Sequence, residues 1–89
     1  MKILVKANID GEVIRCTGTI DIHWKNEHQV YVSWTIFSPA TTIVSKSENF
    51  KYKGTIESST ELINKIIERI LKYRLGRKKI FEEVAIFEK

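Results

Sequence analysis

The chain has 89 residues, of which 43% are hydrophobic and 29% charged, and its formal net charge is +4 at pH 7. These proportions are typical of a globular domain and argue against a disordered chain, so we expect residues 1–89 to form a single domain. No apolar run approaches the ~18 residues that a membrane-spanning helix needs. The first residues also lack a signal-peptide pattern, and these two features together predict a cytoplasmic protein.

The positive charge is concentrated in the second half of the chain. Residues 1–49 carry five basic and five acidic side chains, whereas residues 50–89 carry ten basic and six acidic ones. Between residues 65 and 79, seven basic side chains accompany a single acidic one, Glu68. We therefore expect any surface that attracts a polyanion to include this segment.

The first predicted element is a β-hairpin. Asp10-Gly11 is a dipeptide that tolerates the two positive φ angles of a type I′ turn, and alternating apolar and polar residues flank it. A two-residue turn fixes the register, which pairs Val5 with Cys16 on the core face. The same register sets Lys6 opposite Arg15 on the other face, where two like charges repel each other.

Further strands follow along the chain. The second strand continues to Trp24, and Gly18 predicts a bend or bulge within it. A polar turn then precedes a third strand at residues 30–37, which Pro39 ends. Residues 41–56 predict either one interrupted strand or two short ones. Residues 80–87 predict a final strand with Phe81, Ala85 and Phe87 on one face and Ile80, Val84 and Ile86 on the other.

A single helix is predicted after residue 57. Ser58 and Glu61 have capping-box spacing directly before an apolar-periodic stretch, and we expect the helix to end at Gly76. Its apolar stripe consists of Leu62, Ile63, Ile66, Ile67, Ile70 and Tyr73. The predicted fold is α+β: a curled antiparallel β-meander of four to five strands, packed by this one amphipathic helix, with a C-terminal strand.

The basic residues near the helix divide into two groups. Glu61 with Lys65 and Glu68 with Lys72 have the i,i+4 spacing of helical ion pairs, so these two lysines have an ordinary structural explanation. The remaining cations lie where the helix ends and the last strand begins. They indicate either a solvated basic face or a surface that binds polyanions, and they are Arg74, Arg77, Lys78 and Lys79.

A second basic group combines lysines with aromatic residues, in the run Phe50-Lys51-Tyr52-Lys53. Alternation is typical of a strand with the rings inward and the lysines outward, although sheet-based single-strand binders also combine aromatic rings with lysines. If the strands are adjacent, Lys51 and Lys53 extend a positive outer sheet face that includes Lys6 and Arg15.

Metal and catalytic constellations are weakly represented. Asp21, His23 and His28 are the only nearby residues with ligand potential, and they lack the spacing and number of a zinc site. Cys16 lies on the strand face opposite His23, so the two cannot act as a nucleophile and its base. We expect no catalysis, no metal and no cofactor.

Two functions therefore stay open at the level of sequence. In the first, a small non-catalytic module binds the phosphate backbone of nucleic acid without sequence preference, through the basic corner at the helix end. In the second, the domain is a protein-binding module or a small inhibitor that docks onto a partner, or forms a homodimer, through its last strand. The interface residues of that second function are Ile80, Val84 and Ile86.

Overall fold

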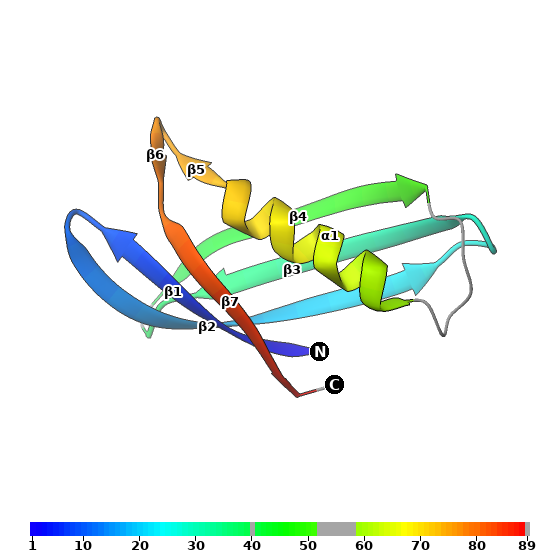
Figure 1. The fold of residues 1–89 in the computed structure, drawn as a ribbon, viewed down its shortest axis with the longest axis horizontal. Helices are drawn as coiled ribbons and strands as arrows, with labels where there is room; N and C mark the ends of the chain where they lie inside the picture. The colour runs from blue at the N-terminus through cyan, green and yellow to red at the C-terminus, as the bar shows by residue number, and fades with distance from the viewer. Residues whose placement is uncertain (40, 52–58, 89) are drawn as a thin grey trace.

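The computed structural model describes residues 1–39, 41–51 and 59–88, and it confirms the expected α+β architecture of antiparallel strands with one helix. A five-stranded sheet has the order β4-β3-β2-β1-β7, so the last strand lies beside the first (Figure 1). A two-stranded hairpin, β5-β6, stands between the helix and β7. The bounds are β1 Lys2–Ile9, β2 Glu12–Trp24, β3 Gln29–Phe37, β4 Thr42–Lys51, α1 Ser59–Lys72, β5 Arg74–Leu75, β6 Lys78–Lys79 and β7 Phe81–Glu88.

The first hairpin has the predicted turn and register. Asp10 and Gly11 have φ angles of 54° and 83°, as a type I′ turn requires. Val5 pairs with Cys16, and Lys6 pairs with Arg15. The core face of this hairpin is buried, since Val5 and Cys16 are both at most 2% exposed.

The long strand β2 connects two parts of a curled sheet. It pairs with β1 over residues 12–19 and with β3 over residues 17–24, so the two ladders overlap for only three residues. Gly18 lies in this overlap, but neither ladder contains the predicted bulge there. A Cβ at Gly18 would lie 2.7 Å from the carbonyl oxygen of Thr35. The glycine therefore permits a close approach of β2 and β3.

The sequence left open whether residues 41–56 form one interrupted strand or two short ones, and the structure describes this segment as far as residue 51. Strand β4 is one continuous strand whose register against β3 shifts only near Phe37. The rest of the predicted interrupted strand, including Tyr52 and Lys53, lies outside the described residues.

The prediction that Phe81 and Val84 lie on opposite faces of the last strand is wrong. Strict alternation places Phe81 and Val84 on opposite faces, but the β1–β7 ladder pairs Phe81 with Ala7 and Val84 with Val5. A register shift between these pairs inserts one extra residue into β7, which is the effect of a β-bulge. Phe81 is therefore fully buried, and Val84 packs against the same core.

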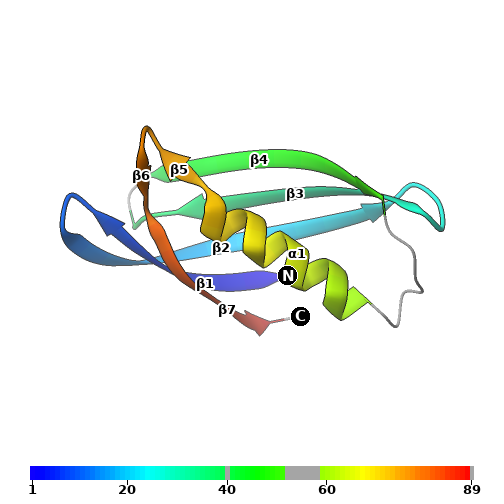
Figure 2. The same ribbon diagram turned by 45° about the horizontal axis from the view of Figure 1, so that its top comes forward.

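The helix covers one face of the sheet, as Figures 1 and 2 show from two directions. Leu62, Ile66 and Ile70 of the predicted stripe are fully buried, whereas Ile63 and Ile67 are half-buried at its sides. The three buried residues recur every four positions, so each lies about one turn beyond the previous one and on the same side of the helix. The predicted cap residue, Ser58, lies outside the described residues.

The helix ends four residues before the predicted stop. Its last residue is Lys72, after which Tyr73 turns its ring toward Trp34 and Phe81, with ring centroids 6.2 Å and 5.6 Å away. Gly76 instead provides the turn of the β5-β6 hairpin, with a φ of 66°. The glycine is thus required for a left-handed conformation, but in a β-turn and not in a helix cap.

Candidate nucleic-acid interface

The four cations that the sequence predicts at the end of the helix lie on the β5-β6 hairpin. This hairpin projects from the end of α1 (Figure 1). Arg74 pairs with Lys79, and Leu75 pairs with Lys78, around the turn at Gly76 and Arg77. The positive φ at the first turn position alone is typical of a type II′ turn, which matches the twist of two-stranded ribbons. A two-residue turn therefore holds the four predicted cations on one short ribbon.

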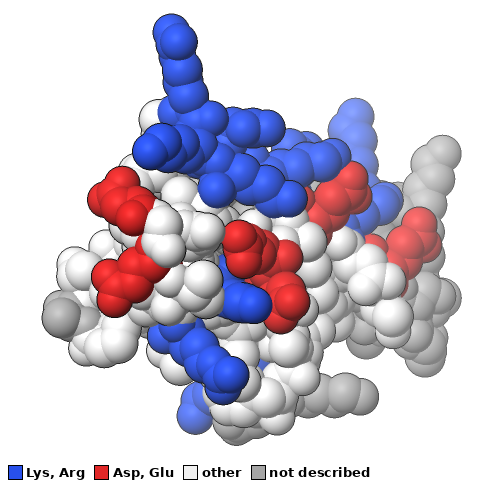
Figure 3. Space-filling model, turned by 60° about the vertical axis from the view of Figure 1, so that its left-hand side comes forward, with Lys and Arg blue, Asp and Glu red and all other residues white. Residues whose placement is uncertain are grey.

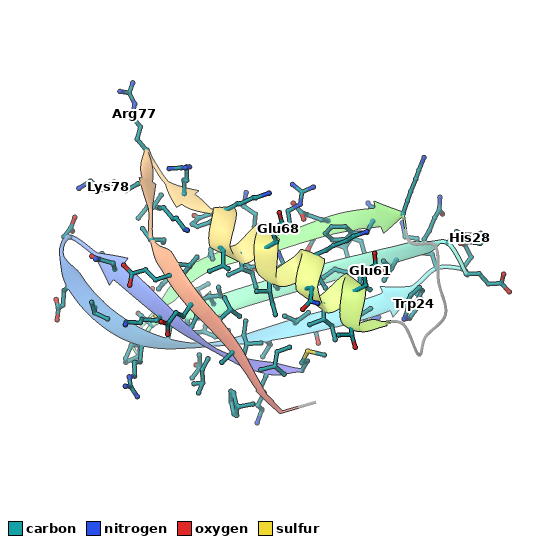
Figure 4. All side chains as sticks on the ribbon, in the orientation of Figure 1. Trp24, His28, Glu61, Glu68, Arg77 and Lys78 are labelled. Atoms are coloured by element: carbon teal, nitrogen blue, oxygen red, sulfur yellow. The ribbon has the colours of Figure 1, made fainter. Side chains whose placement is uncertain are left out.

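All four cations of this hairpin are exposed. Arg77 and Lys78 point away from the body of the molecule (Figure 4). The only polar contact of the hairpin side chains among the described residues is a 3.4 Å hydrogen bond that Nη1 of Arg74 donates to the carbonyl oxygen of Arg77. None of these cations forms an ion pair with a carboxylate of the described residues. Their charge is therefore available to an external anion.

A fifth cation lies at the base of the hairpin and was not among the predicted site residues. Lys46 lies opposite Trp34 on edge strand β4, with its Nζ 5.5 Å from the centroid of the Tyr73 ring. Alternation along β4 places Lys46 on the same side as Val44 and Phe50, which face the core. An exposed charge at an inward position of an edge strand is the sequence signal for it. Hereafter, "basic corner" means Arg74, Arg77, Lys78 and Lys79 together with Lys46.

Two other cations around the helix, Arg69 and Lys72, are engaged in pairs of their own. Lys72 donates a 2.6 Å hydrogen bond to Glu68, which confirms that predicted pair. Arg69 lies 3.9 Å from Glu48 of β4 and 6.0 Å from the ring centroid of Phe50. The predicted pair between Glu61 and Lys65 is not formed.

Figure 3 shows how these charges are distributed on one side of the molecule. Lysine and arginine side chains gather in a band along the upper edge of this view, and acidic side chains lie beneath the band. A second, smaller group of basic side chains lies lower on the same view. Asp10 lines a hollow with Lys78 and Lys79 but makes no ion pair with either lysine.

The other predicted cations do not join the basic corner. Lys6 and Arg15 form a cross-strand pair on the sheet face that the helix leaves uncovered. Lys51 lies opposite Gln29 at the far end of β4, and two strands of the sheet separate it from β1. From Arg15 to the Trp24 end of β2, near Lys51, the strand extends roughly 30 Å. Lys51 therefore does not extend a positive outer face with Lys6 and Arg15, because its strand is not adjacent to β1. Lys53 lies outside the described residues.

The three predicted interface residues of the last strand have different environments. Ile80 is 3% exposed and belongs to the core, and Val84 packs against that core. Ile86 is 37% exposed. One side chain of the three is thus displayed on the surface.

The remaining candidates for chemistry are inward or isolated. Cys16 is 1% exposed, and burial raises the pKa of its thiol, which disfavours the reactive thiolate. Phe50 packs against the core, in agreement with the inward orientation predicted for it. Among residues 1–39, 41–51 and 59–88, the histidine, cysteine and acidic side chains form no group of three that could hold a metal ion. The helix of this part of the chain is too short and too polar to cross a membrane.

Comparison of the chain with models of protein families, with curated proteins and with solved structures finds no match.

Proposed function

We propose that the protein is a small non-catalytic module that binds the phosphate backbone of nucleic acid through the basic corner. The observation that supports this proposal best is that the four hairpin cations are exposed and have no carboxylate partner among the described residues. Salt bridges within a protein neutralise charge, whereas cations left unpaired on a projecting ribbon retain their attraction for a polyanion. Phosphate contacts of this kind carry no information about base sequence, so the proposed binding is nonspecific.

The shape of the hairpin suits this role. A narrow ribbon that projects beyond the end of α1 holds Arg77 and Lys78 away from the body of the molecule (Figure 4). Arginine contributes a planar fork of hydrogen-bond donors for phosphate oxygens. Lysine contributes a compact charge on a flexible side chain. The basic corner holds two arginines and three lysines.

The second candidate function, docking through the last strand, has less support. Ile80 belongs to the core and Val84 packs against it, so these two side chains stabilise the fold of the monomer. Their substitution would therefore unfold the domain before it tested an interface. We favour nucleic acid as the partner for this reason.

The proposal is tested by simultaneous substitution of Arg77, Lys78 and Lys79 by alanine. Fluorescence anisotropy with a labelled oligonucleotide at about 0.1 M salt should show a loss of affinity on the order of a hundredfold. Each phosphate contact contributes about 0.7 to 0.9 to the slope of log affinity against log salt, so the loss of three contacts lowers log affinity by about 2 at this salt concentration. A matched control replaces Lys25, Lys51 and Lys65, which are exposed cations outside the basic corner, and removes the same charge.

The control variant should retain most of the affinity. Equal losses in the two variants would show that net charge alone governs binding, and the basic corner would then have no special role. Absence of binding by the unmodified protein at low salt would reject the proposed function altogether.

A further inference from the structure

The outer face of the sheet, opposite α1, is uncovered in the part of the chain that the structure describes. Three large apolar side chains on this face are exposed: Leu4 by 45%, Phe37 by 38% and Phe87 by 53%. The ladders place Leu4 beside Thr17, and Thr17 beside Phe37, in one row across β1, β2 and β3. Exposed apolar side chains that gather on one face of a sheet mark an interaction site more often than scattered ones do.

Two of these side chains are aromatic and line the same hollow. Phe37 and Phe87 border a hollow of 290 Å³ together with Thr17, Thr19 and Lys2. Neither ring contacts another aromatic ring of the described residues. The volume is close to the lower limit of small-ligand pockets, about 300 Å³. A hollow lined by two aromatic residues and two threonines suits a flat heterocycle that carries hydrogen-bonding groups at its edge.

A pair of cations lies one step further along the same face. Lys6 and Arg15 line a second hollow, of 270 Å³, which also includes Leu4 and Glu83. They are two residues beyond Leu4 and Thr17 along their strands, a separation of about 7 Å. Like charges directly opposite each other destabilise a sheet. Although Glu83 lies opposite Lys6 on β7, it forms no ion pair with either cation.

We propose that this outer face binds single-stranded nucleic acid, with a base held between Phe37 and Phe87 and a neighbouring phosphate bound by Lys6 and Arg15. This inference rests on the proposed function and specifies its ligand: a strand whose bases are unpaired. A duplex hides the faces of its bases, whereas a single strand offers base faces to the rings and phosphates to the cations. A bound phosphate also offsets the repulsion between Lys6 and Arg15, with neither of which Glu83 forms an ion pair.

The test compares three double variants at Phe37 and Phe87, with a fluorescently labelled twelve-residue oligothymidine as the single strand and a duplex of equal length. Alanine at both positions should weaken single-strand binding by about tenfold or more, because one stacked base contributes a factor of about 5 to 150. Leucine at both positions retains apolar surface but removes the π-face, so it should also weaken binding. Tyrosine at both positions should restore it. The control Val13→Ala removes apolar area from the same face, at a position 52% exposed, and should have no effect.

The outcomes separate this inference from the proposed function. If the alanine and leucine variants bind the single strand as tightly as the unmodified protein does, the inference is rejected, and the basic-corner variant then tests the proposed function alone. If light scattering instead shows a dimer that the alanine variant dissociates and the leucine variant retains, a second copy of the chain covers this face and the inference is also rejected. Loss of single-strand binding with unchanged duplex binding supports it.

Discussion

Gly18 lies at the point where two halves of the sheet meet, and its lack of a side chain is a steric requirement. A Cβ there would approach the carbonyl oxygen of Thr35 to 2.7 Å and Cγ1 of Ile3 to 3.0 Å. Because the nearest atom belongs to the backbone of β3, rotation of a neighbouring side chain cannot relieve the contact.

We therefore predict that Gly18→Ala lowers the free energy of unfolding by about 1–3 kcal/mol, the usual effect of overpacking. Urea denaturation followed by circular dichroism measures this change. Shortening Ile3 to alanine in the same chain, which also removes Cγ1, should not recover the loss, since the carbonyl of Thr35 remains in place. A double variant as stable as Ile3→Ala alone would show that the side chain of Ile3, and not the backbone, is the obstacle.

Arg15 is a residue at which stability and binding are predicted to conflict. Replacing Arg15 by glutamate turns the cross-strand pair with Lys6 from repulsive to attractive, and it should stabilise the fold by about 0.2–1 kcal/mol. The gain should shrink at high salt because exposed charges are screened. Arg15→Gln, which removes the charge without reversing it, should give a smaller gain, and glutamate no more stable than glutamine would contradict the account.

The same Arg15→Glu variant should bind oligothymidine more weakly than the unmodified protein does. This is the expected pattern where a fold retains an unfavourable pair of charges for the sake of a ligand. A variant that is both more stable and equally tight in binding would remove the functional reason for the pair.

At the scale of elements, helix α1 provides a prediction about pH. The hydrogen bond from Lys72, together with its charge, holds the pKa of the Glu68 carboxyl below the ordinary value of a glutamate. A pKa that is lower in the folded state means that the pair stabilises the fold above the unfolded pKa, and that this contribution is lost as the pH falls through the folded pKa.

The carboxyl carbon resonance of Glu68, followed by NMR, should therefore titrate at a lower pH in the unmodified protein than in Lys72→Met. The difference in stability between these two proteins should be present at pH 7 and should vanish in acid. Identical titration curves would mean that the pair does not persist in solution.

The elements themselves were predictable wherever a short-range rule determines them. Asp10-Gly11 fixes a two-residue turn, and the register of the entire first hairpin follows from it. The bulge between Phe81 and Val84 was missed, although the two consecutive glutamates, Glu82 and Glu83, interrupt the alternation there; the pairing with β1 shows that the interruption is an extra residue. The end of α1 was misplaced because Gly76 suits a helix stop and a β-turn equally well. The contacts of Tyr73 with Trp34 and Phe81, which are distant in sequence, accompany the earlier end.

At the scale of the whole molecule, the sequence located four of the five cations of the basic corner but not Lys46. Arg74, Arg77, Lys78 and Lys79 form a local excess of positive charge in the sequence. The structure places all four on one hairpin. Lys46 is distant in sequence, and its proximity depends on the packing of β4 against the Tyr73 ring. The expected link between Lys51 and the pair of Lys6 and Arg15 depended on strand order, which puts β2 and β3 between β1 and β4.

The most direct test of the basic corner is the dependence of affinity on salt concentration. For the unmodified protein, the logarithm of the association constant should fall linearly with the logarithm of the salt concentration. Replacing Arg77, Lys78 and Lys79 by alanine should reduce the magnitude of that slope by about 2 to 3, because each lost phosphate contact removes about 0.7 to 0.9. The variant at Lys25, Lys51 and Lys65 should keep the original slope. Equal slopes for the unmodified protein and the hairpin variant would contradict the assignment of phosphate binding to this hairpin.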